Sequence, residues 1–454
     1  MFSSPHTSKS IQHTARSIRC AAHYLLLSMI LGLFSCKSGS LSLFKPASLH
    51  EQYQKKLIAA GLDKTAMGAA WINAAGSSME NAIRIDIPYK ETGYFSVEKA
   101  TAVSYIFNAV RGQKLTLSLD KNPGGQFMIY ADLWMAEDRA NPKLLASMDS
   151  LGRPVELEVT KSTAYMIRLQ PELLRSGNYT VEISTGPSLD FPVRTGTRKK
   201  IDSFWGDSRD DNTRKHEGVD IFAARGTPAI AATTGTVVRV NENNLGGRVV
   251  WMRPAGKDYT LYYAHLDRQI ATEGQNVKTG DTLGLIGDTG NARTTGTHLH
   301  FGIYATGGAI NPLPFINPAV PPLPDITASK ALISSTARTT GTAIMYPLPD
   351  QHATQQITLA QNQVVQVNGA AKDWYRITLP DGKTGFIKGR SIKKVAPIRS
   401  ITIKNDQQEL YEGPDNRSPV KTYLSSGMKV SLLGEYRNYQ LVSNEGQQTG
   451  WISK

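Results

Sequence analysis

The sequence has little cysteine, no long block of one charge and no apolar run long enough to cross a membrane comfortably. Two cysteines among 454 residues cannot form a disulfide framework, so hydrophobic cores must stabilise the chain. The net charge of +13 is spread along the chain, without a basic block and without interleaved basic and aromatic residues. This distribution argues against nucleic acid as a partner and favours an anionic lipid surface or an acidic wall polymer. With 40% hydrophobic and 20% charged residues, the composition is that of a globular protein.

An export signal is predicted over residues 1–36. Three basic residues precede the apolar stretch AAHYLLLSMILGLFSC, which has the charge layout of a leader and ends at Cys36. Its last four residues resemble the lipobox of bacterial lipoproteins, which implies that Cys36 becomes a lipid-modified first residue anchored to a membrane. Cleavage there removes Cys20 and leaves no disulfide. Lys37 stands where some bacteria place an acidic residue to retain lipoproteins at the inner membrane, so the resemblance favours the outer membrane. Simple cleavage and an uncleaved anchor are the alternatives, because Phe34 is bulkier than the usual lipobox residue.

The length of the chain predicts several domains, each large enough for its own core. Residues 37–78 are expected to form a tether and a helical hairpin, in which Ser48 and Glu51 fit a capping box and Asp63 begins the second helix. From 79 to 188 the period changes to two, with short alternating strands separated by turn residues. This pattern predicts an antiparallel β-sandwich, similar to the jelly-roll domains that accompany secreted bacterial peptidases.

Residues 190–316 are also rich in predicted strands, with glycine turns such as EGQNVKTGDTLGLIGDTGN. We expect a central antiparallel sheet here. Residues 317–328 follow as a proline-dense stretch, which is typical of a semi-rigid linker at a domain boundary. The fold class is therefore expected to be mainly β and multidomain.

An internal repeat fills the remainder of the chain. Trp374 matches Tyr439 at an offset of 65 residues, and DGKTGFI lines up with EGQQTGWI at the same offset. Residues 329–396 and 397–454 are therefore expected to be two copies of one small domain. The Gly-aromatic pattern resembles bacterial SH3-like barrels that bind cell-wall peptides. The alternative is that both copies are spacers or packing modules.

The segment THLHF contains the first sign of chemistry. His298 and His300 stand at alternating strand positions, so both side chains face the same side with Cα atoms about 7 Å apart. A pair of buried structural histidines is the alternative. The segment KHEGVD adds His216 and Asp220, and LYYAHLD adds His265.

Two imidazoles and a carboxylate are suitable zinc ligands, and three protein ligands leave the fourth position for water, as in catalytic sites. The remaining histidine of the THLHF pair and His265 are then available as partners that hold the water, take its proton or steady an oxyanion.

HEGVD, YYAHL and THLHF resemble, in order and spacing, the three motifs of the lysostaphin-type zinc metallopeptidases, which cut peptide bonds in the cross-links of bacterial peptidoglycan. The resemblance runs from about residue 200 to residue 312. It implies that His216, Asp220 and His300 bind one zinc ion per chain and that His265 and His298 are the catalytic pair. Degenerate members of the family, which regulate other wall enzymes, typically lack some of these residues, whereas here every motif position is filled.

The leading hypothesis is an exported zinc endopeptidase of the cell envelope, which attacks peptidoglycan cross-links with a zinc-bound water. A non-catalytic wall-binding or regulatory protein with the same domain is the first alternative. A zinc protease acting on other proteins, such as glycine-rich ones, is the second. The sequence predicts neither the bond cleaved nor the oligomeric state.

Overall fold

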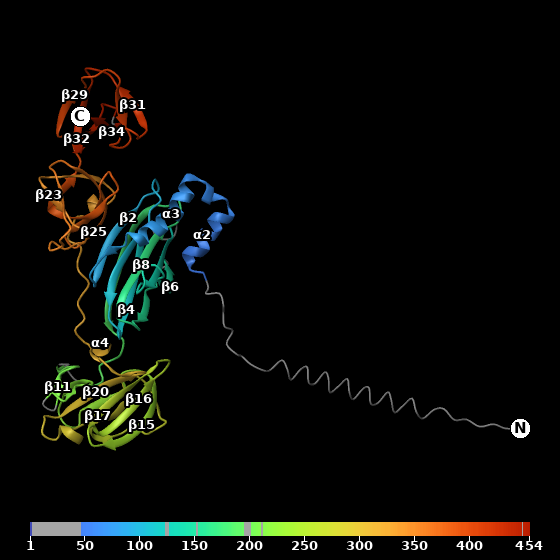
Figure 1. Cartoon of the computed structure of the whole chain (residues 1–454), viewed down its shortest axis with the longest axis vertical. Coiled ribbons are helices and arrows are strands. Elements are labelled where there is room, and N and C mark those ends of the chain that lie inside the picture. Colours follow the sequence, from blue (N-terminus) through green and yellow to red (C-terminus); the bar gives the residue numbers. More distant parts are fainter. Residues whose placement is uncertain (2–46, 123–126, 151–152, 195–200, 210–211, 447) are drawn as a thin grey trace. The chain divides into compact units, whose positions relative to one another are not determined.

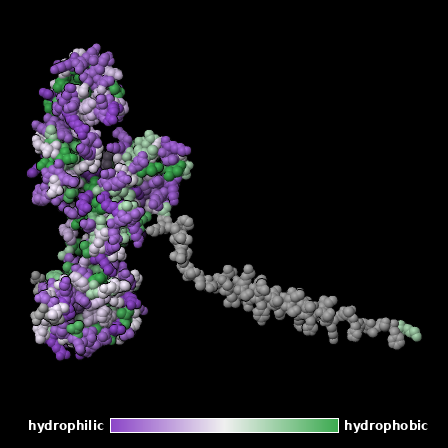
Figure 2. Space-filling model, viewed as in Figure 1, coloured by the Kyte–Doolittle hydropathy of each residue, from purple (hydrophilic) through white to green (hydrophobic). Residues whose placement is uncertain are grey.

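The computed structural model in Figure 1 is mainly β, as expected, and it describes residues 1, 47–122, 127–150, 153–194, 201–209, 212–446 and 448–454. The predicted signal and Cys36 lie outside these residues. Among the helices that are described, none has the length and apolar character needed to cross a bilayer. Hydrophilic residues predominate on the face seen in Figure 2, with apolar residues in small separate patches.

The first helix, α2 (Leu49–Ala59), begins at the predicted capping box. The Ser48 hydroxyl accepts a hydrogen bond from the Glu51 amide at 3.1 Å, and the Glu51 carboxylate accepts one from the Ser48 amide at 3.0 Å. His50 is buried and stacks on Trp71 with ring centroids 4.7 Å apart. The Trp71 indole donates to a backbone carbonyl of the sandwich at 2.8 Å, so the hairpin packs firmly on the strands that follow.

The second helix does not begin at Asp63, which corrects the sequence prediction. Asp63 lies in a 3₁₀ turn (Leu62–Lys64), and α3 (Ala66–Glu80) begins after Thr65. The Thr65 hydroxyl accepts the amide hydrogen of Gly68 at 3.1 Å, so a threonine and not the aspartate supplies the N-cap.

The alternating segments that follow form two sheets. One has the order β1-β3-β8-β5-β6, and the other contributes β2-β9-β4-β7 to a larger sheet (Figure 1). Leu115, Leu117 and Leu119 of β4 are buried, as period-two alternation predicts, and pack with the other sheet in one core. The strands are β1 (Ile83–Arg84), β2 (Tyr89–Phe95), β3 (Val103–Ala109), β4 (Gln113–Asn122), β5 (Ile129–Met135), β6 (Lys143–Asp149), β7 (Val155–Glu158), β8 (Thr163–Pro171) and β9 (Gly177–Pro187).

The central sheet contains ten strands, all paired antiparallel, with the main order β10-β13-β20-β17-β16-β15-β18. The strands are β10 (Ile201–Ser203), β13 (Val219–Phe222), β14 (Pro228–Ile230), β15 (Gly235–Asn243), β16 (Gly247–Pro254), β17 (Tyr259–Gln269), β18 (Asn276–Val277), β19 (Thr282–Ile286), β20 (His298–Ala305) and β21 (Gly308–Ile310). A separate ribbon of β11 (Ser208–Arg209) and β12 (Arg214–Lys215) precedes β13, and the short helix α4 (Leu313–Ile316) follows β21.

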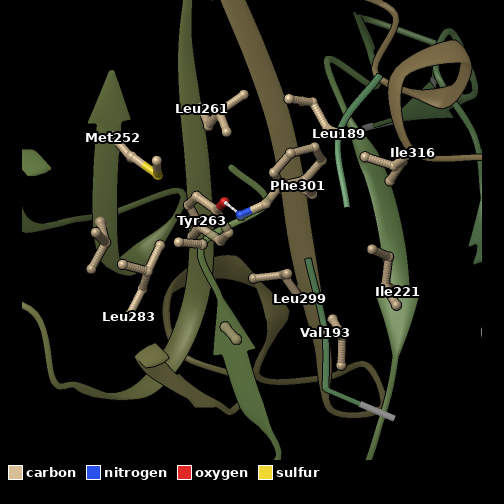
Figure 3. Packing of buried hydrophobic residues seen from close by; sticks show 14 of the residues in the cluster. Leu189, Val193, Ile221, Met252, Leu261, Tyr263, Leu283, Leu299, Phe301 and Ile316 are labelled. Carbon is tan, nitrogen blue, oxygen red and sulfur yellow. Dashed lines mark hydrogen bonds between the residues drawn. The ribbon is translucent and has the colours of Figure 1, made fainter. Parts of the chain in front are cut away.

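One face of the central sheet forms a hydrophobic core (Figure 3). Leu299 and Phe301 are fully buried there, which turns the alternate residues of β20 to the opposite face. The Tyr263 hydroxyl is also buried and accepts the amide hydrogen of Ala232 at 3.0 Å. The core therefore fixes the side of β20 from which His298 and His300 project.

The two C-terminal copies share a central three-stranded meander, β25-β26-β27 in the first and β32-β33-β34 in the second. Their strands are β22 (Thr336–Thr339), β23 (Ala343–Met345), β24 (Ile357–Leu359), β25 (Val364–Ala371), β26 (Trp374–Thr378), β27 (Thr384–Lys388) and β28 (Ile392–Lys394) in the first, and β29 (Arg399–Thr402), β30 (Gln408–Tyr411), β31 (Val420–Leu424), β32 (Lys429–Tyr436), β33 (Tyr439–Ser443) and β34 (Thr449–Ser453) in the second. The bounds of β32, β33 and β34 lie 65 residues after those of β25, β26 and β27. Within the described ranges no ring of strand pairings closes either copy into a barrel, so the SH3-like interpretation stays a prediction.

The first C-terminal copy shares a sheet with the sandwich. Strand β2 pairs with β25, and β26 places Arg376 against Glu91 of β2, with Nη2 and Oε1 2.9 Å apart. Both side chains are buried. The hydroxyls of Tyr89 and Tyr105 donate to the Glu91 carboxylate at 2.6 and 2.7 Å. Strand pairing and a hydrogen-bonded buried ion pair therefore join the two modules.

Candidate metal centre

The three predicted ligands come together where β13 pairs with β20. Antiparallel pairing places Asp220 opposite His300, and His216 precedes β13. Their ligand atoms lie within 4.8 Å of one another. His216 Nε2, Asp220 Oδ1 and His300 Nδ1 are each 3.0 Å from the other two atoms.

This donor set fits zinc. Zinc bonds to nitrogen and oxygen ligands are about 2.0 to 2.2 Å long, so a tetrahedral site separates its ligand atoms by about 3.3 Å. The observed separations are close to that value. Neutral imidazoles and an ionised carboxylate are also the protonation states that a metal requires.

Local backbone features hold the predicted ligands in place. The Nδ1–H of His216 donates to the carbonyl of Phe204 at 2.8 Å, which leaves Nε2 for the metal. Gly218 lies so close to His300 that an added Cβ would be 2.6 Å from the ring carbon Cε1. The glycine of the HEGVD motif is therefore needed where the backbone meets the imidazole.

The charges at the site follow from burial and hydrogen bonding. Burial alone would raise the pKa of Asp220, but hydrogen bonds with His216 and His300 outweigh it and hold the pKa of this carboxyl well below its usual range. Burial lowers the pKa of His300. The result is a carboxylate facing a neutral imidazole near neutral pH.

His265 and His298 stand beside the three ligands. Their ring centroids are 4.9 Å apart, and His298 Nε2 is 3.8 Å from Asp220 Oδ1. The Nδ1–H of His265 donates to the Thr289 carbonyl and that of His298 to the Gly296 carbonyl, both at 2.8 Å. In its neutral form, each imidazole therefore keeps Nε2 as a lone-pair acceptor.

The backbone at His265 is unusual. Its φ of 62° lies in the left-handed region, and the register between β16 and β17 shifts across this residue, between Tyr263 and Leu266. A bulge of this kind re-aims a side chain at some cost in backbone strain. The amide of His265 donates to the Gly246 carbonyl at 2.8 Å, which secures the bulge. The bulge in β17 thus lies at the residue, His265, that contacts His298 and His300.

Residues 214–312, which contain all five of these residues, match the model described as peptidase family M23. The chain contains a peptidase family M23 domain. The chain is 43% identical over 101 residues to an uncharacterized metalloprotease of Haemophilus influenzae, covering 22% of this chain and 21% of the relative. It is 38% identical over 99 residues to peptidoglycan DD-endopeptidase ShyC of Vibrio cholerae, covering 22% of each chain.

Among solved structures, the catalytic domain of lysostaphin from Staphylococcus simulans is 30% identical, with a TM-score of 0.24. That match covers 26% of this chain and 91% of the lysostaphin domain. The chain spans about a fifth of the length of the curated relatives named above.

Sequence reasoning missed several residues that support the M23 site. Arg209 pairs with Asp220, and Phe222 stacks on His298 with ring centroids 5.0 Å apart. Thr289 supplies the carbonyl that orients His265. No spacing rule identifies such residues, because each acts through a neighbour that only the folded sheet provides.

Proposed function

We propose that the protein is an exported zinc endopeptidase that hydrolyses peptide bonds in the cross-links of bacterial peptidoglycan. The observation that carries the proposal is the cluster of three zinc-type ligands with two further imidazoles beside it, inside an M23 domain. The peptidoglycan DD-endopeptidase name of the relative from Vibrio cholerae supports the substrate class. A degenerate, non-catalytic domain is disfavoured because no motif position is vacant.

His216, Asp220 and His300 would hold the metal. Zinc, when bound, supplies Lewis-acid polarisation of a water and of the scissile carbonyl. The buried carboxylate would offset part of the metal charge, and the two imidazoles would complete a three-residue set that leaves the fourth position open.

His265 and His298 are proposed to move protons and to hold oxygen atoms. Burial, aided by the neighbouring His300 and His298, lowers the pKa of His265 to about 4, so its Nε2 is an unprotonated acceptor near neutral pH. An imidazole in this state can accept a proton from the attacking water and return it to the leaving amine. The Thr289 carbonyl fixes the tautomer that this exchange requires.

The envelope location is proposed from the leader. The export signal over residues 1–36 and the lipobox-like ending at Cys36 support a lipid anchor, and Lys37 supports the outer membrane. A lipid on Cys36 would keep the M23 domain within reach of the wall. The two C-terminal copies are proposed as wall-binding modules, because two weak sites on one chain raise the effective concentration of the second.

The test is digestion of purified sacculi followed by muropeptide analysis, with and without a chelator. We expect cross-linked dimers to fall, and the chelator and Asp220→Ala each to abolish this change. Cross-links that persist after prolonged digestion with the zinc-loaded protein would contradict the proposal. Cleavage of a casein or a glycine-rich protein alone would support a general protease in its place.

A further inference from the structure

A cation lies directly against one of the three metal-site residues. Arg209, at the end of β11, places Nη2 2.9 Å from Oδ2 of Asp220. The Arg209 side chain is 30% exposed and that of Asp220 is 10% exposed, so the pair is largely shielded from water. Ion pairs on a fully exposed surface contribute little, but a shielded guanidinium can define the orientation of a carboxylate.

The two oxygens of Asp220 have different neighbours. Oδ1 lies 3.0 Å from His216 Nε2 and 3.0 Å from His300 Nδ1, on the ligand side of the carboxylate. Oδ2 is turned away from these atoms and accepts the hydrogen bond from Arg209. Rotation of the carboxylate to present both oxygens to a metal would break that hydrogen bond.

Arg209 is itself held in place by a second hydrogen bond. Its Nη2 also donates to the hydroxyl of Ser203, which lies 3.3 Å from Nδ1 of His216. The same hydroxyl donates to the Asp207 carboxylate at 3.1 Å. Arg209 therefore belongs to one hydrogen-bonded network with the outer nitrogen of a second metal-site residue.

We propose that Arg209 is a positioning residue that keeps Asp220 as a one-oxygen ligand, so that a coordination position stays open beside His216 and His300. This inference rests on the proposed zinc site. It assigns to Arg209 a role that acts through Asp220 and involves no contact with substrate. Partners of this kind orient metal ligands, and their loss lowers metal affinity by about 10- to 100-fold.

The experiment compares the full chain with Arg209→Gln, Arg209→Lys and a matched control, Arg225→Gln. Arg225 forms ion pairs with Asp267 and Asp288, which are not among the proposed ligands, so the control removes the same charge from the same domain. Zinc affinity is measured by competition with a chelating dye. Coordination is followed by the visible absorption spectrum of the Co²⁺-substituted proteins, and folding by circular dichroism.

We expect Arg209→Gln to weaken zinc binding by about 10- to 100-fold and to lower the Co²⁺ absorption intensity, as a second carboxylate oxygen joins the metal. Arg209→Lys should restore most of both, because an ammonium still engages Oδ2. Arg225→Gln should match the wild type. If Arg209→Gln also matches the wild type in zinc affinity and in the Co²⁺ spectrum, the positioning role is wrong. Failure of the wild-type chain to bind zinc would contradict the proposed function first, which keeps the two failures distinct.

Discussion

At the scale of single residues, the two histidines of β20 have different surroundings although both lie on one face of the strand. His300 is in contact with Asp220 and His216, whereas His298 approaches Asp220 Oδ1 only at 3.8 Å and stacks on Phe222. The difference supports separate roles, one in metal binding and one in proton transfer.

Alanine substitutions should separate these roles. His300→Ala is expected to lose both zinc and activity, because one of the three proposed ligands is gone. His298→Ala is expected to retain zinc at saturation while its rate falls by about 10²- to 10⁴-fold, the usual effect of removing a positioned acid or base. Metal analysis and turnover of cross-linked muropeptides at saturating zinc provide the measurements.

His265→Ala should behave like His298→Ala. His352→Ala is the matched control, because His352 is exposed in a C-terminal module and should leave both readouts unchanged. The assignment of roles is wrong if His298→Ala is metal-free at saturating zinc or turns over at the wild-type rate.

A second residue-scale prediction concerns pH and His50. Burial, helped by the charge of Arg168, lowers the pKa of His50 to about 4 from 6.5. The unfolded chain therefore binds a proton that the folded chain does not take up between these values. The stability contributed by His50 is fully present above about pH 6.5 and is lost as the pH falls towards about 4, by on the order of 3 kcal/mol.

The measurement is the melting temperature of wild type and His50→Gln across this range. The variant is expected to melt lower at neutral pH, because it loses the stack on Trp71, but to have a shallower dependence on pH. Parallel pH profiles for the two proteins would show that His50 does not titrate in this way.

At the scale of elements, the site depends on strand ends and turns. Strand β20 is regular and presents two histidines by alternation, whereas β17 requires a bulge with a φ of 62° to present His265. The HEG turn before β13 must let the backbone approach the His300 ring. Small backbone changes at these points should therefore affect the metal more than the fold.

Gly218→Ala tests the turn. The added Cβ would be 2.6 Å from His300 Cε1 and 2.7 Å from the carbonyl oxygen of Phe301, so the ring or the turn must shift. We expect zinc affinity to fall by about tenfold or more, as measured by chelator competition. Gly76→Ala is the control, because its Cβ would meet nothing within 4 Å and alanine favours the helix. Equal zinc affinities for the two variants would refute the steric argument.

At the scale of the whole molecule, the first C-terminal copy forms a buried ion pair with the sandwich, so its removal should affect the stability of the sandwich. Glu91 in the sandwich is fully buried, and its charge partner Arg376 comes from the first copy. Removal of one partner of a buried ion pair leaves the other charge buried and unpaired, at a cost of about 3 to 5 kcal/mol. The first copy therefore contributes to the stability of the sandwich, whatever it binds.

Two truncations should separate wall binding from stability. Deletion of 397–454 is expected to weaken sedimentation with sacculi while leaving cleavage of a small soluble peptide nearly intact, since all five site residues precede residue 312. Deletion of 329–454 should weaken sedimentation further and also lower the melting temperature, because Glu91 loses Arg376. Unchanged sedimentation of both truncated chains would count against wall-binding modules.

The stability argument has its own control. In the chain without 329–454, Glu91→Gln should recover part of the lost melting temperature, since it removes the unpaired buried charge. The same substitution in the full chain should destabilise, because it leaves Arg376 without its partner. A loss of stability in both backgrounds would show that the ion pair does not account for the effect.

The sequence by itself was enough to predict the mainly β character, the capping box at Ser48 and the five residues proposed for the site. Alternation, cap chemistry and motif spacing are local properties, so they can be recognised without a fold. The same local reasoning placed the second helix start at Asp63, whereas in the folded chain Asp63 lies in a 3₁₀ turn and Thr65 is the N-cap.

Only the tertiary structure decided how these residues meet. The pairing of β13 with β20 sets Asp220 against His300, and the β17 bulge aims His265 at the same place. Local sequence patterns predict neither of the two ion pairs. Arg209 contacts Oδ2 of Asp220, and Arg376 contacts Glu91, from which it is separated by 285 residues. The physical reason is that a charge pair or a strained backbone is stable only when surrounding strands exclude water and fix its geometry, and those strands come from distant parts of the chain.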